Sequence, residues 1–217
     1  MKYNGNVAWT FFHSTSGGRT AAIQHVWNAA PIPYLVSVAD PHDTISPYHN
    51  WGPSRFSARQ LRTSLGSLAP AGALRDATVA RNGSQRVDAV TFRGSGGTKQ
   101  VSGSSVQARL GLRSSWFAIT VLQLGGPTTS TAAKRQTLTG IARGFRTVWL
   151  EKKIGSGAWT KVRDLTPEAG KVQTVVRPRV TTWFRLGSSR GPSPAHRIRI
   201  TTTASLRAAA LGASLSP

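Results

Sequence analysis

The interpretation of this chain depends on the stretch Phe11-Phe12-His13-Ser14-Thr15-Ser16-Gly17-Gly18-Arg19-Thr20. Large apolar residues lead into small hydroxyl residues and then into two glycines. Paired glycines allow positive φ and let another chain or a ligand approach the backbone closely. The stretch therefore predicts a strand end that presents a histidine, several hydroxyls and backbone N–H groups, which suits a polar polymer such as a glycan.

The composition indicates a globular and strongly basic protein. The 217 residues are enough for one large or two small domains with a real core. Lys and Arg outnumber Asp and Glu by 28 to 7, which gives a net charge of +21. A field of that sign favours polyanions such as nucleic acid, anionic membrane surfaces or acidic cell-wall polymers. Because the basic residues are scattered from Lys2 to Arg207 without a dense run, the charge indicates a diffuse basic surface rather than a nucleic-acid site.

The residue types also exclude several classes of function. The chain has no cysteine, which rules out disulfides, zinc thiolate sites, iron–sulfur clusters and cysteine nucleophiles. No apolar stretch approaches the roughly 18 residues that a membrane span requires. The first five residues, Met-Lys-Tyr-Asn-Gly, do not begin a hydrophobic signal core. The sequence as given therefore predicts neither a membrane span nor a signal peptide.

Two domains, a linker and a tail are expected from the hydrophobic pattern. Residues 124–136 show no hydrophobic periodicity and predict a linker between a domain at 1–123 and another at 137–201. Strand-like segments dominate the first domain, at 7–15, 34–39, 77–81, 86–93, 98–102 and 116–123, and Gly94 to Gly97 suits a hairpin turn. Two short helices are expected after Ser57 and Ser104. The first domain is therefore predicted to be α+β and rich in strands.

The second domain and the tail have different patterns. Residues 137–201 contain six or seven short apolar segments separated by turn residues, which indicates a small β-sandwich. Residues 202–217 are rich in alanine and are expected to be a disordered tail. The predicted fold class is mainly β.

Few residues are suited to acid–base chemistry. The first domain contains four aspartates, namely Asp40, Asp43, Asp76 and Asp88, and no glutamate. Asp40 and Asp43 lie in a turn-rich loop, where aspartate commonly has a structural role. Asp88 lies on a strand and is expected to face solvent. No aspartate is thus assigned a catalytic role.

Other polar and aromatic residues leave alternatives open. A hydrolase using His13 with Ser14 or Ser16 would need a base oriented by a third group, and the nucleophile-elbow pattern is absent. Zinc could be bound by histidines, but no helix-spaced pair supports it, so no cofactor is expected. The histidines considered are His13, His25, His42 and His49. Tyr48 and Trp51 are the aromatic residues most suited to stack on sugars.

Taken in order, these features resemble the C-terminal half of the SpoIID/LytB domain, found in sporulation protein SpoIID and the amidase enhancer LytB. The matching pieces are Tyr3-Asn4-Gly5, the stretch 11–20, Pro33 to Val38 with Asp40-Pro41, Trp51, the strand 83–92, Val101-Ser102-Gly103 and Leu110 to Phe117. The resemblance implies peptidoglycan as the substrate and a location outside the cell, at the wall. It implies either lytic transglycosylation or assistance to a cell-wall amidase.

The resemblance also defines which residues are expected to act. The family's catalytic glutamate lies in an N-terminal half that nothing here matches, so no catalytic residue is assigned. The chain is therefore expected to bind glycan strands or assist a hydrolase without an acid of its own. Alternatives are a fragment of an active transglycosylase whose gene start is placed too late, and a basic nucleic-acid-binding protein. The residues expected to face glycan are His13, Ser14, Ser16, Gly17, Gly18, Tyr48 and Trp51.

Residues 137–201 resemble the small immunoglobulin- or fibronectin-like domains appended to secreted actinobacterial proteins. The matching pieces are Leu138-Thr139-Gly140, Val148-Trp149-Leu150, Trp159 to Val162 and Thr181 to Leu186. Domains of this type imply a spacer or an adhesive module.

Overall fold

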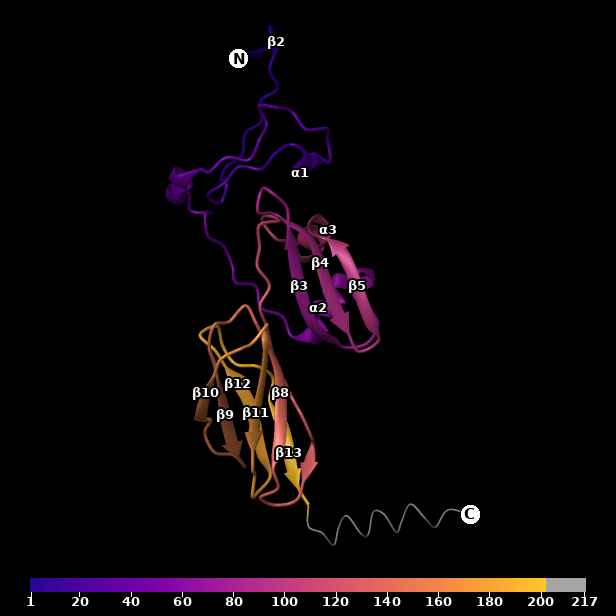
Figure 1. Ribbon diagram of the computed structural model, residues 1–217, viewed down its shortest axis with the longest axis vertical. Helices are drawn as coiled ribbons and strands as arrows, with labels where there is room; N and C mark the ends of the chain where they lie inside the picture. Colours follow the sequence, from indigo (N-terminus) through magenta and orange to yellow (C-terminus); the bar gives the residue numbers. More distant parts are fainter. Residues whose placement is uncertain (202–217) are drawn as a thin grey trace, which may run out of the picture. The chain divides into compact units, whose positions relative to one another are not determined.

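The protein has a mainly β fold, as the sequence predicts, and divides into two compact units (Figure 1). The computed structural model describes residues 1–201, so the predicted tail at 202–217 lies outside the described residues. The first unit comprises Met1–Phe117 and the second begins at Ala118. Each unit is described by itself below.

The first unit is built on a three-stranded antiparallel meander. Its strands are β3 (Leu74–Arg81), β4 (Val87–Gly94) and β5 (Gly97–Ser102), and Gly94 pairs with Gly97 at the predicted hairpin turn. Helices α2 (Ala58–Leu65) and α3 (Gly103–Leu110) contact these strands, and a short 3-10 helix, η2 (Gly66–Leu68), follows α2. The core side chains Phe92, Val90, Leu65 and Val106 are almost fully buried.

Both helices begin with serine caps, one of them not where the sequence predicts. Ser57 and Gln60 form the expected capping box at the start of α2. At α3 the cap is Ser102 rather than Ser104, because the Ser102 hydroxyl accepts the backbone N–H of Ser105. The helix begins earlier than expected because Gly103 fits directly against β4. A Cβ there would lie 1.9 Å from the Val87 carbonyl oxygen.

Residues 1–56 contain much less regular structure than the sequence predicts. The regular elements are β1 (Lys2–Tyr3), β2 (Asn6–Val7), α1 (Gln24–Trp27) and the 3-10 helix η1 (Pro41–Ile45). The strands expected at 7–15 and 34–39 are not formed, apart from β2 and an isolated bridge at Arg19 and Ala39. Some backbone N–H groups that could pair with a neighbouring strand are hydrogen-bonded to side chains instead. The Thr20 hydroxyl, for example, accepts the N–H of Val38.

This part of the chain exposes an unusual number of large apolar side chains. Several of them come from the segments that the sequence assigns to strands. Among the most exposed are Val7, Trp9, Phe12, Trp27 and Ile45. A contiguous apolar surface on a folded protein commonly marks an interaction site or an aggregation hazard.

The second unit is a sandwich of two sheets. One sheet has the order β10-β9-β12-β13-β7 and the other has the order β11-β8-β6. Leu138, Leu150, Val176, Phe184 and Ile198 come from both sheets and form one buried cluster between them. The strands are β6 (Val121–Gly125), β7 (Thr129–Ser130), β8 (Gln136–Arg143), β9 (Val148–Ile154), β10 (Thr160–Leu165), β11 (Lys171–Val176), β12 (Thr182–Gly187) and β13 (His196–Ile200).

The segment predicted as a linker belongs to this sandwich. Residues 121–125 form β6, which pairs with β8, and Thr129 and Ser130 form β7, which pairs in parallel with β13. The division between the units falls at Phe117 and Ala118 instead of at 124–136. The segment 124–136 has the polar composition of a linker. It can still belong to the sandwich because β7 is an edge strand of only two residues, which needs no apolar periodicity.

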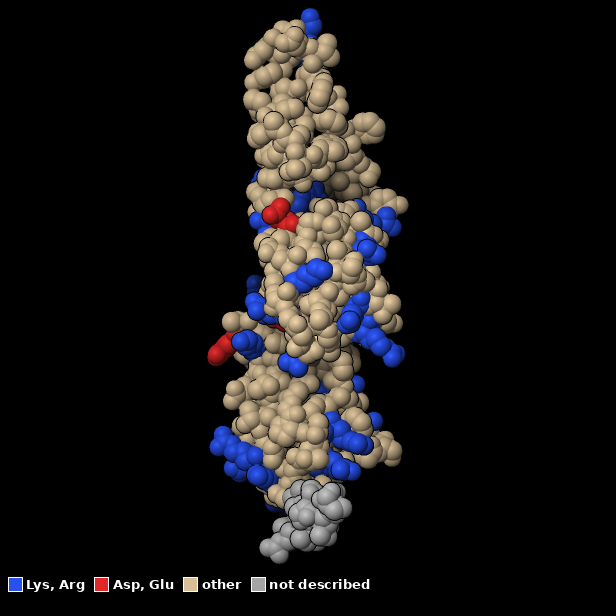
Figure 2. Space-filling view, turned by 90° about the vertical axis from the view of Figure 1, so that its right-hand side faces the viewer, with Lys and Arg blue, Asp and Glu red and all other residues tan. Residues whose placement is uncertain are grey.

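The positive charge is unevenly distributed along the chain. Residues 1–50 contain only Lys2, Arg19, Asp40 and Asp43 as charged residues, whereas residues 118–201 contain 15 Lys and Arg against 3 Asp and Glu. In the face shown in Figure 2, the N-terminal region is mostly tan, whereas blue side chains are scattered over the rest of the described residues. Within residues 1–201, no helix is both long and apolar enough to cross a membrane.

Candidate functional site

The candidate site is the loop of residues 13–18, in which the Asp43 carboxylate accepts most of the hydrogen bonds. Asp43 accepts the Thr15 hydroxyl at 2.7 Å and the backbone N–H groups of Ser16 and Gly17 at 2.6 and 2.9 Å. The Nδ1 atom of His49 lies 2.7 Å from the other side of the same carboxylate. Asp43 is only 8% exposed. It therefore joins the 13–18 loop to the segment 40–49.

The hydrogen bonds keep the Asp43 carboxyl ionised. Burial on its own would raise the pKa of this group, but the hydrogen bonds from His49, Thr15 and the backbone of Ser16 and Gly17 outweigh it. They hold the pKa of Asp43 well below its usual range. A carboxyl in this state accepts hydrogen bonds at neutral pH and has no proton to give.

Arg86 holds the same loop as a positively charged hydrogen-bond donor, whereas Asp43 is a negatively charged acceptor. Its guanidinium donates to the Ser16 carbonyl at 2.9 Å, to the Arg19 carbonyl at 3.2 Å and to the Ser114 hydroxyl at 2.8 Å. It also lies over the Trp116 ring, 4.8 Å from the centroid. Burial lowers the pKa of Arg86 and the Asp43 charge raises it. Arg86 comes from the β3–β4 turn, so the irregular loop is tied to the sheet.

Of the predicted glycan-facing side chains in the 13–18 loop, two are exposed and one is buried. His13 and Ser14 are exposed, directly before the fixed segment. Ser16 is only 1% exposed, and its hydroxyl donates to Asp40 at 2.8 Å and accepts the Gly18 N–H at 3.0 Å. The prediction that Ser16 faces a ligand is therefore corrected, because its hydroxyl is used inside the loop.

The two glycines are needed for the shape of the loop. Gly17 and Gly18 have φ values of +74° and +100°, in the region that favours glycine. A Cβ on Gly17 would lie 3.1 Å from the Trp116 ring, and one on Gly18 would lie 3.5 Å from His49. Both residues are half-buried. Their backbone is thus covered on one side by Trp116 and His49.

The predicted aromatic residues, Tyr48 and Trp51, flank His49 in the sequence. Tyr48 precedes His49, is 47% exposed and carries the Arg113 guanidinium 4.6 Å from its ring centroid. Trp51 follows two residues after His49 and is half-buried. Tyr48 is therefore the more exposed of the two rings, with the Arg113 guanidinium over one of its faces.

Two other kinds of site were considered from the sequence, a serine–histidine hydrolase site and a metal site. A nucleophilic Ser16 activated by His13 does not fit, because the Ser16 hydroxyl donates to Asp40. A second serine–histidine contact, Ser84 with His25 Nδ1 at 2.7 Å, involves a fully buried hydroxyl that also accepts the Ala22 N–H. Among residues 1–201, no group of three His, Asp or Glu side chains is placed to hold a metal ion.

Sequence reasoning did not identify Asp43, His49, Arg86 and Trp116 as parts of the site. Asp43 and Asp40 were interpreted as loop residues that bond their own backbone, whereas they hold the 13–18 loop, more than 20 residues away. The one signal available was the rarity of acids in the first unit. In a strongly basic chain, two aspartates within four residues indicate a specific role.

No protein-family model matches the chain, and a search of curated proteins gives no match.

Proposed function

We propose that this protein binds the glycan strands of peptidoglycan outside the cell and assists a cell-wall hydrolase such as an amidase, without contributing a catalytic acid. The observation that carries the proposal is the fixed 13–18 loop. Asp43 and Arg86 hold it from two sides, so that His13 and Ser14 are presented on a rigid support. The resemblance of residues 1–123 to the C-terminal half of the SpoIID/LytB domain supports the same function.

The accessible residues have the chemistry that a glycan requires. Sugar hydroxyls are both donors and acceptors, and so are the imidazole of His13 and the hydroxyl of Ser14. The ring of Tyr48 offers an apolar face with a polar tip, which suits a sugar ring. Sites of this kind combine apolar rings with a few polar groups that fix orientation.

The acids of the site are unsuited to glycosidic cleavage. That reaction needs an acid that protonates the leaving oxygen. Asp43 is ionised and surrounded by four donors, and Asp40 accepts the Ser16 hydroxyl. We therefore assign binding and assistance, not cleavage, to these residues.

Retention of the full chain on insoluble peptidoglycan tests the binding. In about 1 M salt the Debye length falls to about 3 Å, so attraction by the diffuse basic surface is suppressed. Under that condition His13→Ala and Tyr48→Ala should each reduce retention. His42→Ala is the matched control, because His42 is an exposed histidine of the same unit and makes no part of the proposed surface. Equal retention of all variants would contradict the assignment of the surface.

Two activity measurements test the rest of the proposal. Release of peptides by a purified cell-wall amidase should increase when the full chain is added, and the increase should shrink with His13→Ala. The chain alone should release no fragments from purified glycan strands. Turnover of glycan strands by the chain alone would instead support the alternative of an active transglycosylase.

A further inference from the structure

We infer that the second unit carries a separate binding face for a phosphodiester-linked polymer of the cell wall. The face is the outer surface of the larger sheet, where indole rings alternate with cations. We call it the tryptophan–cation face. It consists of Trp149, Lys153, Trp159, Lys161, Trp183, Arg185, Arg197 and Arg199.

The alternation of side chains along the strands creates this face. In β9, Val148 and Leu150 are fully buried and Trp149 between them points to the other side. In β12, Phe184 and Leu186 face the core, so Trp183 and Arg185 share the outer side. The register opposes Trp183 to Arg197 of β13.

Each tryptophan of the face is covered by a cation of the same chain. Arg185 lies 4.1 Å and Lys153 lies 5.5 Å from the Trp159 centroid. Arg197 lies 5.2 Å from the ring of Trp183. Cation–π contacts of this kind restrict the long side chains and keep their N–H groups at the surface.

Trp149 shows that the rings are not open platforms. Its indole lies across Gly187 of β12, where an added Cβ would be 2.1 Å from Nε1. The ammonium of Lys161 lies 5.8 Å from the ring centroid. With backbone and a cation against it, this ring is poorly placed to stack on a nucleic-acid base. The face therefore offers charge rather than stacking.

The positive charge of the face is only partly neutralised. Glu151 is engaged by Arg185 at 2.5 Å and by the Trp149 N–H at 2.8 Å, and Asp164 pairs with Lys161. In the part of the chain that the structure describes, no carboxylate forms an ion pair with Lys153, Arg197 or Arg199. These three cations are the ones left to receive an anion.

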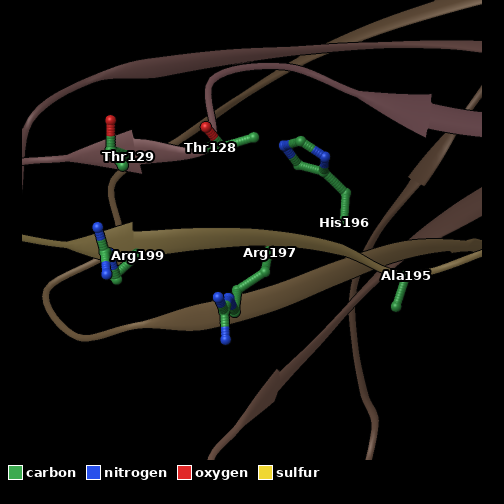
Figure 3. Close-up of a pocket in the computed structure, with 6 residues that line it drawn as sticks. All are labelled: Thr128, Thr129, Ala195, His196, Arg197 and Arg199. Carbon is green, nitrogen blue, oxygen red and sulfur yellow. The ribbon is translucent and has the colours of Figure 1, made fainter.

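A hollow at the β13–β7 edge provides a place for that anion. Its volume is about 400 Å³, and it is lined by Thr128, Thr129, Ala195, His196, Arg197 and Arg199. Figure 3 shows both arginines projecting from β13, with the two threonines on the neighbouring segment. The arginines are two residues apart on one strand, about 7 Å along its axis. A linear polymer with one charge for each repeating unit can contact both.

The donors of this hollow suit a phosphodiester. Arginine binds phosphate and carboxylate alike through its planar fork. The two unesterified oxygens of a phosphodiester can accept from that fork, and the hydroxyls of Thr128 and Thr129 are further donors in the lining of the hollow. Because the indole rings are covered, a phosphodiester chain gains nothing from carrying bases. These observations favour a wall polymer of polyol phosphates over a nucleic acid.

Binding of the full chain to lipid-free poly(glycerol phosphate), followed by tryptophan fluorescence between about 50 and 400 mM salt, tests this inference. Each phosphate contact contributes about 0.7 to the slope of log affinity against log salt for a single strand. The pair Arg197→Ala and Arg199→Ala should reduce that slope by about 1.4 and weaken binding about tenfold at low salt. Both side chains are exposed, so circular dichroism and the melting temperature should not change.

A matched control separates the face from net charge alone. The pair Arg146→Ala and Lys171→Ala removes two exposed cations outside the face and should weaken binding less than twofold. Equal weakening by both pairs, or no binding by the unmodified chain, would overturn the inference. So would tenfold tighter binding of oligo(dT) with the same number of phosphates, or equally tight binding of polygalacturonate. Poly(glycerol phosphate) contains no glycan strand. Its binding therefore tests the tryptophan–cation face independently of the test of His13 and Tyr48 on peptidoglycan.

Discussion

Replacing Arg86 by alanine should release the 13–18 loop while leaving the rest of the first unit folded. The guanidinium donates three hydrogen bonds, to Ser16, Arg19 and Ser114, and each one from a charged donor contributes about 1.5–3 kcal/mol. Simple addition would give about 4.5–9 kcal/mol. Because the Arg86 side chain is half-buried, water can replace part of the lost hydrogen bonding. The three contributions also share one side chain, so they do not add. We expect the opening free energy of the loop to fall by about 2–4 kcal/mol.

Amide hydrogen exchange measures this opening directly. The N–H groups of Ser16 and Gly17 donate to Asp43, so they are protected while the loop is closed. A loss of about 2–4 kcal/mol corresponds to roughly 30- to 1,000-fold faster exchange at these two amides. Arg86→Lys keeps the charge but loses the planar fork, and should give an intermediate acceleration.

The matched control is Arg93→Ala, which removes an exposed arginine of β4, the strand that begins directly after Arg86. It should leave exchange at Ser16 and Gly17 unchanged. The reasoning is refuted if Arg86→Ala leaves the two amides as protected as in the unmodified chain, or if Arg93→Ala accelerates them equally. Loss of high-salt retention on peptidoglycan should follow the acceleration, since His13 and Ser14 precede the loosened segment.

Three further changes have defined outcomes. Folding lowers the pKa of Asp43, so the contribution of this carboxylate to stability is complete above about pH 4, the usual pKa in the unfolded chain. That contribution is lost as the pH falls below this value. Asp43→Asn should therefore flatten the fall in the urea midpoint between about pH 5 and pH 2.5. Gly187→Ala should displace the indole of Trp149 and lower the free energy of unfolding of the second unit by about 1–3 kcal/mol. It should also change the near-ultraviolet circular dichroism, and an unchanged spectrum would contradict the packing described. Ser57→Ala should cost about 1 kcal/mol in the thermal unfolding of the first unit, with no effect on the loop amides.

The features that the sequence could predict are local ones. The capping box at Ser57 and the hairpin between Gly94 and Gly97 depend on residues within a few positions of each other. The mainly β class and the two-sheet second unit follow from apolar segments separated by turn residues. Strands expected at 7–15 and 34–39 did not form, since apolar periodicity cannot tell whether a partner strand exists.

The candidate site could be predicted only in part, because its contacts join distant segments. Asp43 meets Ser16 across 27 residues and Arg86 meets it across 70. Nothing in the local pattern around Ser16 distinguishes a buried hydroxyl from one that faces a ligand. The face on the second unit was missed for the same reason, since Trp149 lies over Gly187 from another strand.

The exposed apolar side chains of residues 7–45 have a consequence for the colloidal behaviour of the protein. The charges of residues 1–50 balance, so this region lacks the electrostatic repulsion that a net charge of +21 gives to the chain as a whole. Added salt screens that repulsion and leaves the attraction between exposed Trp9 and Phe12 rings undiminished. Reversible clustering of molecules should therefore increase with ionic strength, opposite in sign to the loss of polyanion binding.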